Sequence, residues 1–195
     1  MLAKILAHKN LILASGSPRR QQFFKDLGVD FKIVLKPVDE IYPDHLKGAQ
    51  ITDFLAQLKA SAFTEIGPDD IIVTSDTIVW HNEQALNKPK DRKEAIGMIQ
   101  SLSGATHQVI TSVTFTMLNE QKTINDTTSV TFKTLSQEEI EYYVDNFQPY
   151  DKAGGYGVQE WFGYIAVTHI EGSYFNVMGM PMHKVYETLL HIEDQ

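Results

Sequence analysis

Residues 11–20 (LILASGSPRR) constrain the fold of this chain more than any other stretch, because a strand signal and a helix start follow one another without a linker. Residues 11–14 are apolar and typical of a buried strand, and residues 15–17 are typical of a tight turn. Pro18 is favoured at the first position of a helix. We therefore expect a strand that leads directly into a helix N-terminus, where unpaired N–H groups carry partial positive charge.

Four side chains of this turn could strengthen an anion site. Ser15 and Ser17 offer hydroxyl groups, and Arg19 and Arg20 offer guanidinium groups, a combination that suits phosphate. An ordinary capped turn with solvated arginines fits the same residues, because their spacing matches neither of the common glycine-rich phosphate motifs. Later parts of the chain favour the phosphate interpretation.

An acidic residue interrupts the strongest strand pattern. Residues 71–80 (IIVTSDTIVW) are β-branched nearly throughout and predict a central strand that is covered on both faces. Asp76 lies in the middle of this run, and a buried carboxylate is costly unless it is hydrogen-bonded, paired or bound to a cation. We expect Asp76 to be a site residue; the alternative is a bulge or strand end where it binds backbone N–H groups.

Three further charged residues are candidates. Lys59 follows Leu55 by four residues on an expected helix, so it lies near the apolar side and either snorkels to water or points at an anion. Lys88 is held by the following proline in a basic loop, which suits an anion ligand. Glu40 lies in a proline-flanked loop, where acidic residues are usually just solvated.

A second glycine-rich stretch covers residues 151–159 (DKAGGYGVQ). It could be a plain loop between a helix and a strand. As a site, it would let the backbone approach a ligand closely while Gln159 offers a donor and an acceptor to the edge of a base.

The remaining elements predict a mixed α/β or α+β domain. Strands are expected at 31–35 and 164–170 and as a hairpin within 107–132, and helices after Pro18, over 51–62 with closure at 67–68, over 91–102, over 136–147 with Phe147 buried, and near the C-terminus. Dispersed polar motifs between short elements indicate a cleft that gathers several loops.

Composition excludes several classes. The 195 residues suit one domain over 1–195, and a net charge of −8 argues against a broad nucleic-acid or anionic-membrane surface. With no cysteine, disulfides, thiol nucleophiles and thiolate metal sites are excluded. Lys4 and His8 interrupt the apolar start before a signal peptide can form, so we expect a cytoplasmic protein.

The chain resembles the Maf family of nucleoside triphosphate pyrophosphatases. The resemblance covers almost the whole chain in the family's order, and it is carried by LASGSPRR at 13–20, VDE at 38–40, LKA at 58–60, SDTIV at 75–79, NKP at 87–89, LSGATHQV at 102–109, DKAGGYGVQ at 151–159, GSY at 172–174 and GMP at 179–181. It implies an elongated mixed sheet flanked by helices, as in the inosine triphosphatases, with a central cleft between two lobes. It also implies a possible homodimer.

The resemblance implies roles for the residues found above. Asp76 would be the proton acceptor that activates water, and Glu40 would help it to hold a divalent cation (Mg²⁺, Mn²⁺ or Co²⁺). The phosphates would be held by Ser15, Ser17, Arg20, Lys59 and Lys88.

Three positions resemble the branch of the family that prefers dTTP and UTP. These are Arg19, Thr77 and Gln159; a branch acting on 7-methyl-GTP tends to carry Trp after the proline and Gln after the aspartate. Gly155 and Glu160 depart mildly from the usual Ala and Gly. Glu160 follows Gln159 directly and bears on which base is preferred.

We therefore expect a pyrophosphatase that converts dTTP and UTP to the monophosphate and pyrophosphate. One alternative is a regulatory protein that binds nucleotides without turning them over, for which Asp76 and Glu40 would bring no benefit. Another is a pyrophosphatase for a different nucleotide, such as 7-methyl-GTP, inosine triphosphate or a modified pyrimidine triphosphate.

Overall fold

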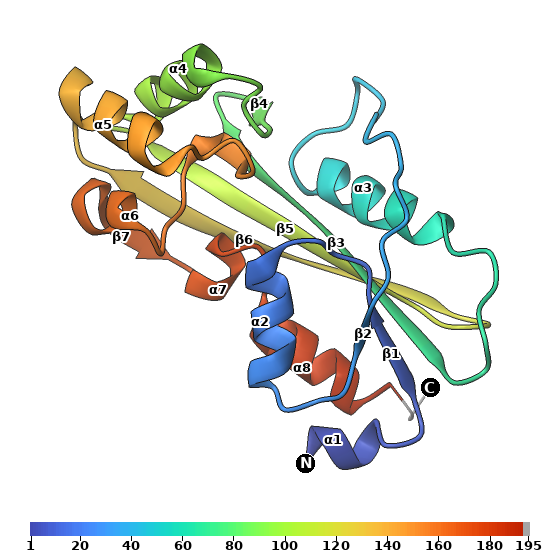
Figure 1. Cartoon of the computed structure of the whole chain (residues 1–195). Coiled ribbons are helices and arrows are strands. Elements are labelled where there is room, and N and C mark those ends of the chain that lie inside the picture. Colours follow the sequence, from blue (N-terminus) through green and yellow to red (C-terminus); the bar gives the residue numbers. More distant parts are fainter. Residues whose placement is uncertain (193–195) are drawn as a thin grey trace. The chain divides into compact units, whose positions relative to one another are not determined.

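The computed structural model describes residues 1–192, which form two compact units (Figure 1). The first unit contains Met1–Asp76, Thr111–Asp126 and residues 179–192. The second contains Thr77–Ile110 and Thr127–Met178. The described residues contain no helix that is long and apolar enough to cross a membrane.

Both units contribute to one mixed sheet with the strand order β2-β1-β3-β5-β6-β7, in which β4 also pairs with β3. β1 pairs in parallel with β2 and β3, whereas the β3–β4 and β6–β7 pairs are antiparallel. The strands are β1 (Asn10–Leu13), β2 (Lys32–Ile33), β3 (Asp70–His81), β4 (Gln84–Leu86), β5 (Thr106–Thr116), β6 (Gln121–Phe132) and β7 (Val167–Glu171). The predicted mixed α/β class is confirmed, while the single two-lobed domain with its cleft stays a prediction.

The first unit packs its helices around the parallel strands. They are α1 (Leu2–Ile5), α2 (Pro18–Asp26), α3 (Ala49–Ser61) and α8 (Met182–Leu190). Helix α1 packs against α8, so the beginning and the end of the described chain lie together (Figure 1). Leu13 and Val73 are fully buried and face each other in the parallel register of β1 and β3.

The predicted passage from strand to helix is confirmed. β1 ends at Leu13, Ser17 is the N-cap of α2 and Pro18 is its first residue. The Ser17 side chain makes no capping hydrogen bond to the helix N–H groups. Its backbone N donates to Ser15 Oγ at 3.3 Å. Gly28 closes the helix at a φ of 66°, which a residue with a Cβ rarely adopts.

Two local expectations of this unit need correction. The strand expected over 31–35 is only Lys32–Ile33, and both residues are exposed, because β2 is the edge strand of the sheet. Helix α3 ends at Ser61, six residues before Gly67, and buries Ile51, Leu55 and Ala60 more deeply than Leu58.

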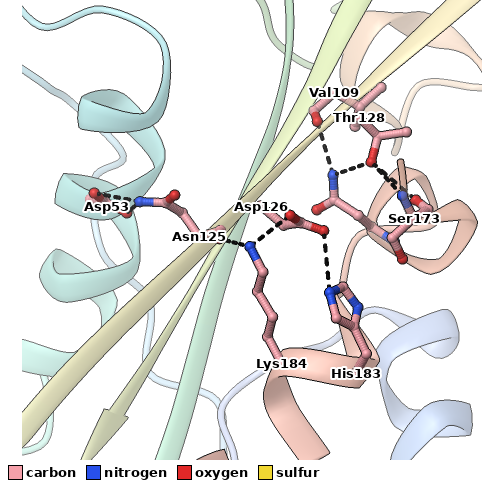
Figure 2. Close-up of polar contacts among 9 residues, drawn as sticks. Asp53, Val109, Asn125, Asp126, Thr128, Ser173, His183 and Lys184 are labelled. Atoms are coloured by element: carbon pink, nitrogen blue, oxygen red, sulfur yellow. Dashed lines mark hydrogen bonds and ion pairs between the residues drawn. The ribbon is translucent and has the colours of Figure 1, made fainter. Parts of the chain in front are cut away.

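Adjacent residues of β6 hold helices on opposite faces of the sheet, because side chains alternate along a strand. Figure 2 shows Asn125 Nδ2 donating to both carboxylate oxygens of Asp53 in α3, each at 3.1 Å. On the other face, Asp126 Oδ1 lies 2.7 Å from Nζ of Lys184 in α8. The Asn125 bonds hold α3, which carries Lys59, and the Asp126 contact holds α8.

The second unit has its own hydrophobic core. Its helices are α4 (Arg92–Leu102), α5 (Gln137–Phe147), the 3₁₀ helix η1 (Ala153–Gly155), α6 (Trp161–Ala166) and α7 (Tyr174–Val177). Tyr143, Phe132 and Phe162 are almost completely buried at its centre. Ser136 and Glu139 form a capping box at the start of α5, where the helix was expected to begin. A buried amide, Asn176 Nδ2, donates to Val109 O and to Thr128 Oγ1, each at 3.0 Å (Figure 2).

Two expectations for this unit need correction. The stretch 164–170 was expected to be a strand, but α6 occupies 161–166 and β7 begins at Val167, because the helix buries Phe162 and Ala166 in the core. Phe147 was expected to be buried, yet it is 36% exposed. It is the last residue of α5, directly before the left-handed Gln148, and there the helical periodicity no longer directs it inward.

Replacing Gly154 by alanine is expected to destabilise the protein by about 2–3 kcal/mol, because Gly154 has a φ of 68° and a Cβ there would lie 2.7 Å from Val79 Cγ2. Urea unfolding of Gly154→Ala measures this loss. Gly97→Ala is the matched control, since a Cβ at Gly97 in helix α4 meets nothing within 4 Å and alanine favours a helix by up to about 1 kcal/mol. Equal midpoints for the two variants would contradict the prediction.

Candidate functional site

One lysine joins two carboxylates in the first unit. Lys59 Nζ lies 2.5 Å from Asp76 Oδ1 and 3.1 Å from Glu40 Oε1. Asp76 is buried, with 7% of its surface exposed, whereas the Glu40 side chain is 44% exposed. The structure therefore brings together the predicted base, the predicted cation ligand and one predicted phosphate ligand.

A buried hydrogen bond sets the position of Lys59 over the strand. Thr74 Oγ1 donates to Ala56 O at 2.7 Å, which ties β3 to α3. Thr74 and Asp76 are two residues apart and lie on the same face of β3, while Ala56 and Lys59 are three apart on one side of α3. The contact between strand and helix thus aligns Lys59 with Asp76.

Arg20 is held by main-chain carbonyl groups. Its Nε donates to Gly179 O at 2.9 Å, and its Nη1 donates to Ser75 O at 3.0 Å. Lys59 Nζ also donates to Ser75 O, at 3.4 Å. The Ser75 carbonyl oxygen therefore accepts from both Arg20 and Lys59. It holds the Arg20 guanidinium group near the Asp76 carboxylate.

Burial and charge act in opposite directions on Asp76. Burial raises the pKa of the Asp76 carboxyl above its ordinary value, and the positive charges of Lys59 and Arg20 oppose that rise. Burial is also the main reason that the pKa of Arg20 is lowered to about 10. Arg20 remains charged at neutral pH.

The turn before α2 is braced by its own side chains. Ser15 is buried, and its carbonyl oxygen accepts from Gln21 Nε2 at 3.1 Å. Arg19 and Ser17 are half-buried in the same turn. Sequence reasoning missed Gln21, although its place one helical turn after Ser17 is a usable signal. It also missed the carbonyl of Gly179, for which the GMP stretch at 179–181 was only an indirect sign.

The other predicted residues lie in the second unit. Lys88 is exposed, and Thr77 and Gln159 are half-buried. Gly154 N donates to Asn87 O at 3.1 Å, so the glycine-rich stretch is bonded to the segment that carries Lys88. The expectation that these three residues act together with Asp76 stays a prediction.

No three His, Cys, Asp or Glu side chains gather into a metal-binding group anywhere in residues 1–192. Glu40 and Asp76 supply carboxylate oxygens, which suit a hard cation that completes its shell with other oxygen ligands.

Comparison with known proteins gives concordant results. A family model described as "Maf-like protein" matches residues 10–192. A dTTP/UTP pyrophosphatase of Flavobacterium johnsoniae is 60% identical over 97% of this chain and 98% of its own length. A dTTP/UTP pyrophosphatase of Bacteroides fragilis is 51% identical over 97% and 98%, respectively.

A solved structure of a HAM1 protein from Coxiella burnetii is similar in fold. The TM-score is 0.52 at 10% sequence identity, and the match covers 94% of this chain and 99% of the other. At that identity, the likeness concerns the fold alone.

Removing the Lys59 charge is expected to raise the pKa of Asp76 further, because the ammonium group favours the ionised carboxylate. The NMR titration of the Asp76 carboxyl carbon in Lys59→Gln and in the parent protein measures the shift. Lys36→Gln is the control, since Lys36 contacts Ala62 O and the Phe63 ring instead. A lowered or unchanged pKa in Lys59→Gln would show that the ion pair does not control this carboxyl group.

Proposed function

The chain belongs to the family of Maf-like proteins, and on that premise we propose that it hydrolyses dTTP and UTP to the nucleoside monophosphate and pyrophosphate. The names and the high identity of its bacterial relatives support this substrate class. The single observation that carries the proposal is the buried Asp76 carboxylate with Lys59 at 2.5 Å. A protein that only binds anions would gain nothing from such a group.

Asp76 acts as the general base that takes a proton from water. A base works best when its pKa lies near the working pH, and burial moves the pKa of Asp76 upward from that of an ordinary aspartate. The positive charges of Lys59 and Arg20 favour the ionised form of the carboxyl group, which is the form that accepts a proton. The activated water attacks phosphorus, and the bond between the α- and β-phosphates breaks.

Ser15, Ser17, Arg20, Lys59 and Lys88 hold the phosphates in this proposal. Arg20 is suited to the role because two carbonyl groups already fix its guanidinium plane, so that little side-chain entropy is lost when an anion binds. Lys59 has two roles, because the same ammonium group favours the ionised form of Asp76 and can contact a phosphate oxygen.

A divalent cation (Mg²⁺, Mn²⁺ or Co²⁺) would be held by Glu40 and Asp76 together with oxygens of the substrate and water. Arg20 and Lys59 are balanced by Asp76 and Glu40, so the four side chains carry almost no net charge. A triphosphate therefore needs further positive charge at this point. When bound, the cation supplies that charge and withdraws electrons from the phosphate oxygens.

Base selectivity is assigned to Arg19, Thr77 and Gln159, as the resemblance to the dTTP/UTP branch implies. The Gln159 amide can offer a donor and an acceptor to a pyrimidine edge. Turnover of 7-methyl-GTP or inosine triphosphate in place of dTTP would contradict this assignment.

We place the protein in the cytoplasm, as a homodimer that acts on free nucleotides rather than on nucleic acid.

Asp76→Asn is expected to lower the rate of pyrophosphate release from dTTP and UTP at least about a hundredfold, because general-base catalysis contributes 10²–10⁴. Asp69→Asn is the matched control, with an exposed carboxyl group whose ion pair with Lys9 is 3.6 Å long. Pyrophosphate detection on a nucleotide panel measures both variants. Release by Asp76→Asn at the parent rate would remove Asp76 from the mechanism.

Glu40→Gln is expected to raise the Mg²⁺ concentration required for half-maximal activity, because the variant loses one anionic oxygen ligand. Activity of the parent protein should disappear in a chelator and return when Mg²⁺ is added. Titration of activity against Mg²⁺ measures the shift, and Glu65→Gln is the control because Glu65 is an exposed residue between α3 and β3. Parent activity that survives the chelator would refute the cation requirement.

A further inference from the structure

A nearly buried lysine marks the start of the glycine-rich stretch in the second unit. Lys152 is 8% exposed, and its Nζ lies 2.7 Å from Asp151 Oδ1 and 3.1 Å from Glu160 Oε1. Glu160 stands directly after Gln159. The ion pair between Lys152 and Glu160 therefore joins the two ends of the segment that carries Gln159.

The hydroxyl group of Tyr143 completes this network from helix α5. It donates to Glu160 Oε2 at 2.6 Å and accepts from Gly157 N at 2.9 Å. Tyr143 is fully buried, and burial raises the pKa of its hydroxyl group, so the group keeps its proton and remains a donor. One buried tyrosine thus holds a backbone group and a side chain on either side of Gln159.

The Glu160 carboxylate folds back over Gly157. A Cβ at Gly157 would lie 2.7 Å from Glu160 Cδ, so only glycine leaves room for this arrangement. Glu160 N also donates to Gly157 O at 3.2 Å. Residues 157–160 therefore form a tight turn that both backbone and side-chain bonds close, with Gln159 within it.

A buried ion pair is a poor way to gain stability alone, because desolvation offsets most of its attraction. A buried ion pair can, however, fix the positions of the residues that it joins. A glutamine amide can turn over and exchange its donor for its acceptor, and a free glutamine would therefore accept either of two opposite base edges. Discrimination by Gln159 requires that its backbone and the approach of its side chain be fixed.

We propose that Tyr143, Glu160 and Lys152 form a positioning network that fixes Gln159 and thereby sets the base selectivity of the enzyme. This inference rests on the proposed function, in which Gln159 contacts the base. Tyr143 and Glu160 act through Gln159 and are positioning residues. The substrate edge selected is that of a uracil or thymine ring, which presents an N–H donor beside a carbonyl acceptor, against cytosine, which presents the reverse.

Tyr143→Phe tests the network with the smallest change, because it removes one hydroxyl group and keeps the buried ring. We expect the ratio of kcat/KM for UTP to that for CTP to fall about tenfold, because Glu160 and the Gly157 amide lose the hydroxyl group that holds them on either side of Gln159. The Gly157 amide should also exchange its hydrogen faster, which is measured without substrate. Glu160→Gln, which removes the charge that pairs with Lys152, should lower the ratio in the same direction.

Two controls separate positioning from general stability. Tyr142→Phe removes the same hydroxyl group one residue earlier on α5, where the side chain is 51% exposed, and should leave the ratio unchanged. In the background of Gln159→Ala, adding Tyr143→Phe should change the UTP/CTP ratio no further, because the residue that the network positions is gone.

An active parent protein whose ratio is unchanged in both Tyr143→Phe and Glu160→Gln would overturn the inference alone. The same conclusion would follow if the effects of Gln159→Ala and Tyr143→Phe on the ratio were independent. A parent protein that releases no pyrophosphate from UTP would instead overturn the proposed function, and this inference with it.

Discussion

The pairing of Lys59 with the buried Asp76 is the interaction on which the rest of the site depends. Burial disfavours the charge of a carboxylate in the middle of a covered strand, and a nearby cation opposes that effect. The 2.5 Å contact with Lys59 favours the ionised carboxylate, and it also links α3 to β3. The bonds from Thr74 to Ala56 and from Asn125 to Asp53 hold the helix in this place.

Main-chain carbonyls are as important here as charged side chains. Ser75 O and Gly179 O accept hydrogen bonds from Arg20, and these carbonyl groups orient its guanidinium group without adding a formal negative charge. In the second unit, too, a main-chain group takes part: the Gly157 N–H group donates to the Tyr143 hydroxyl. In the first unit, two carbonyl groups orient Arg20, and in the second unit the Tyr143 hydroxyl holds the turn that contains Gln159. Arg20 and Gln159 are both suited to contact a ligand.

Local elements of the fold follow directly from local patterns. The passage from β1 to α2, the strand around Asp76 and the capping box at Ser136 are all specified by residues that are close in sequence. Errors arose where tertiary contacts compete with local preference. A strand was expected over 164–170, but burial of Phe162 and Ala166 in the core favours helix α6, and the strand begins only at Val167. Isolated patterns also could not show that β2 is an exposed edge strand of two residues.

By itself, the sequence determined which groups are chemically unusual: a carboxylate within an apolar strand, a lysine near the apolar side of a helix, and a glutamine at the end of a glycine-rich stretch. Only the tertiary structure decided their partners. Lys59 reaches Asp76 across 17 residues, and Arg20 reaches Gly179 across 159. The physical reason is that a carbonyl oxygen is present in every residue, so its use as a ligand leaves no mark in the sequence until the chain has folded.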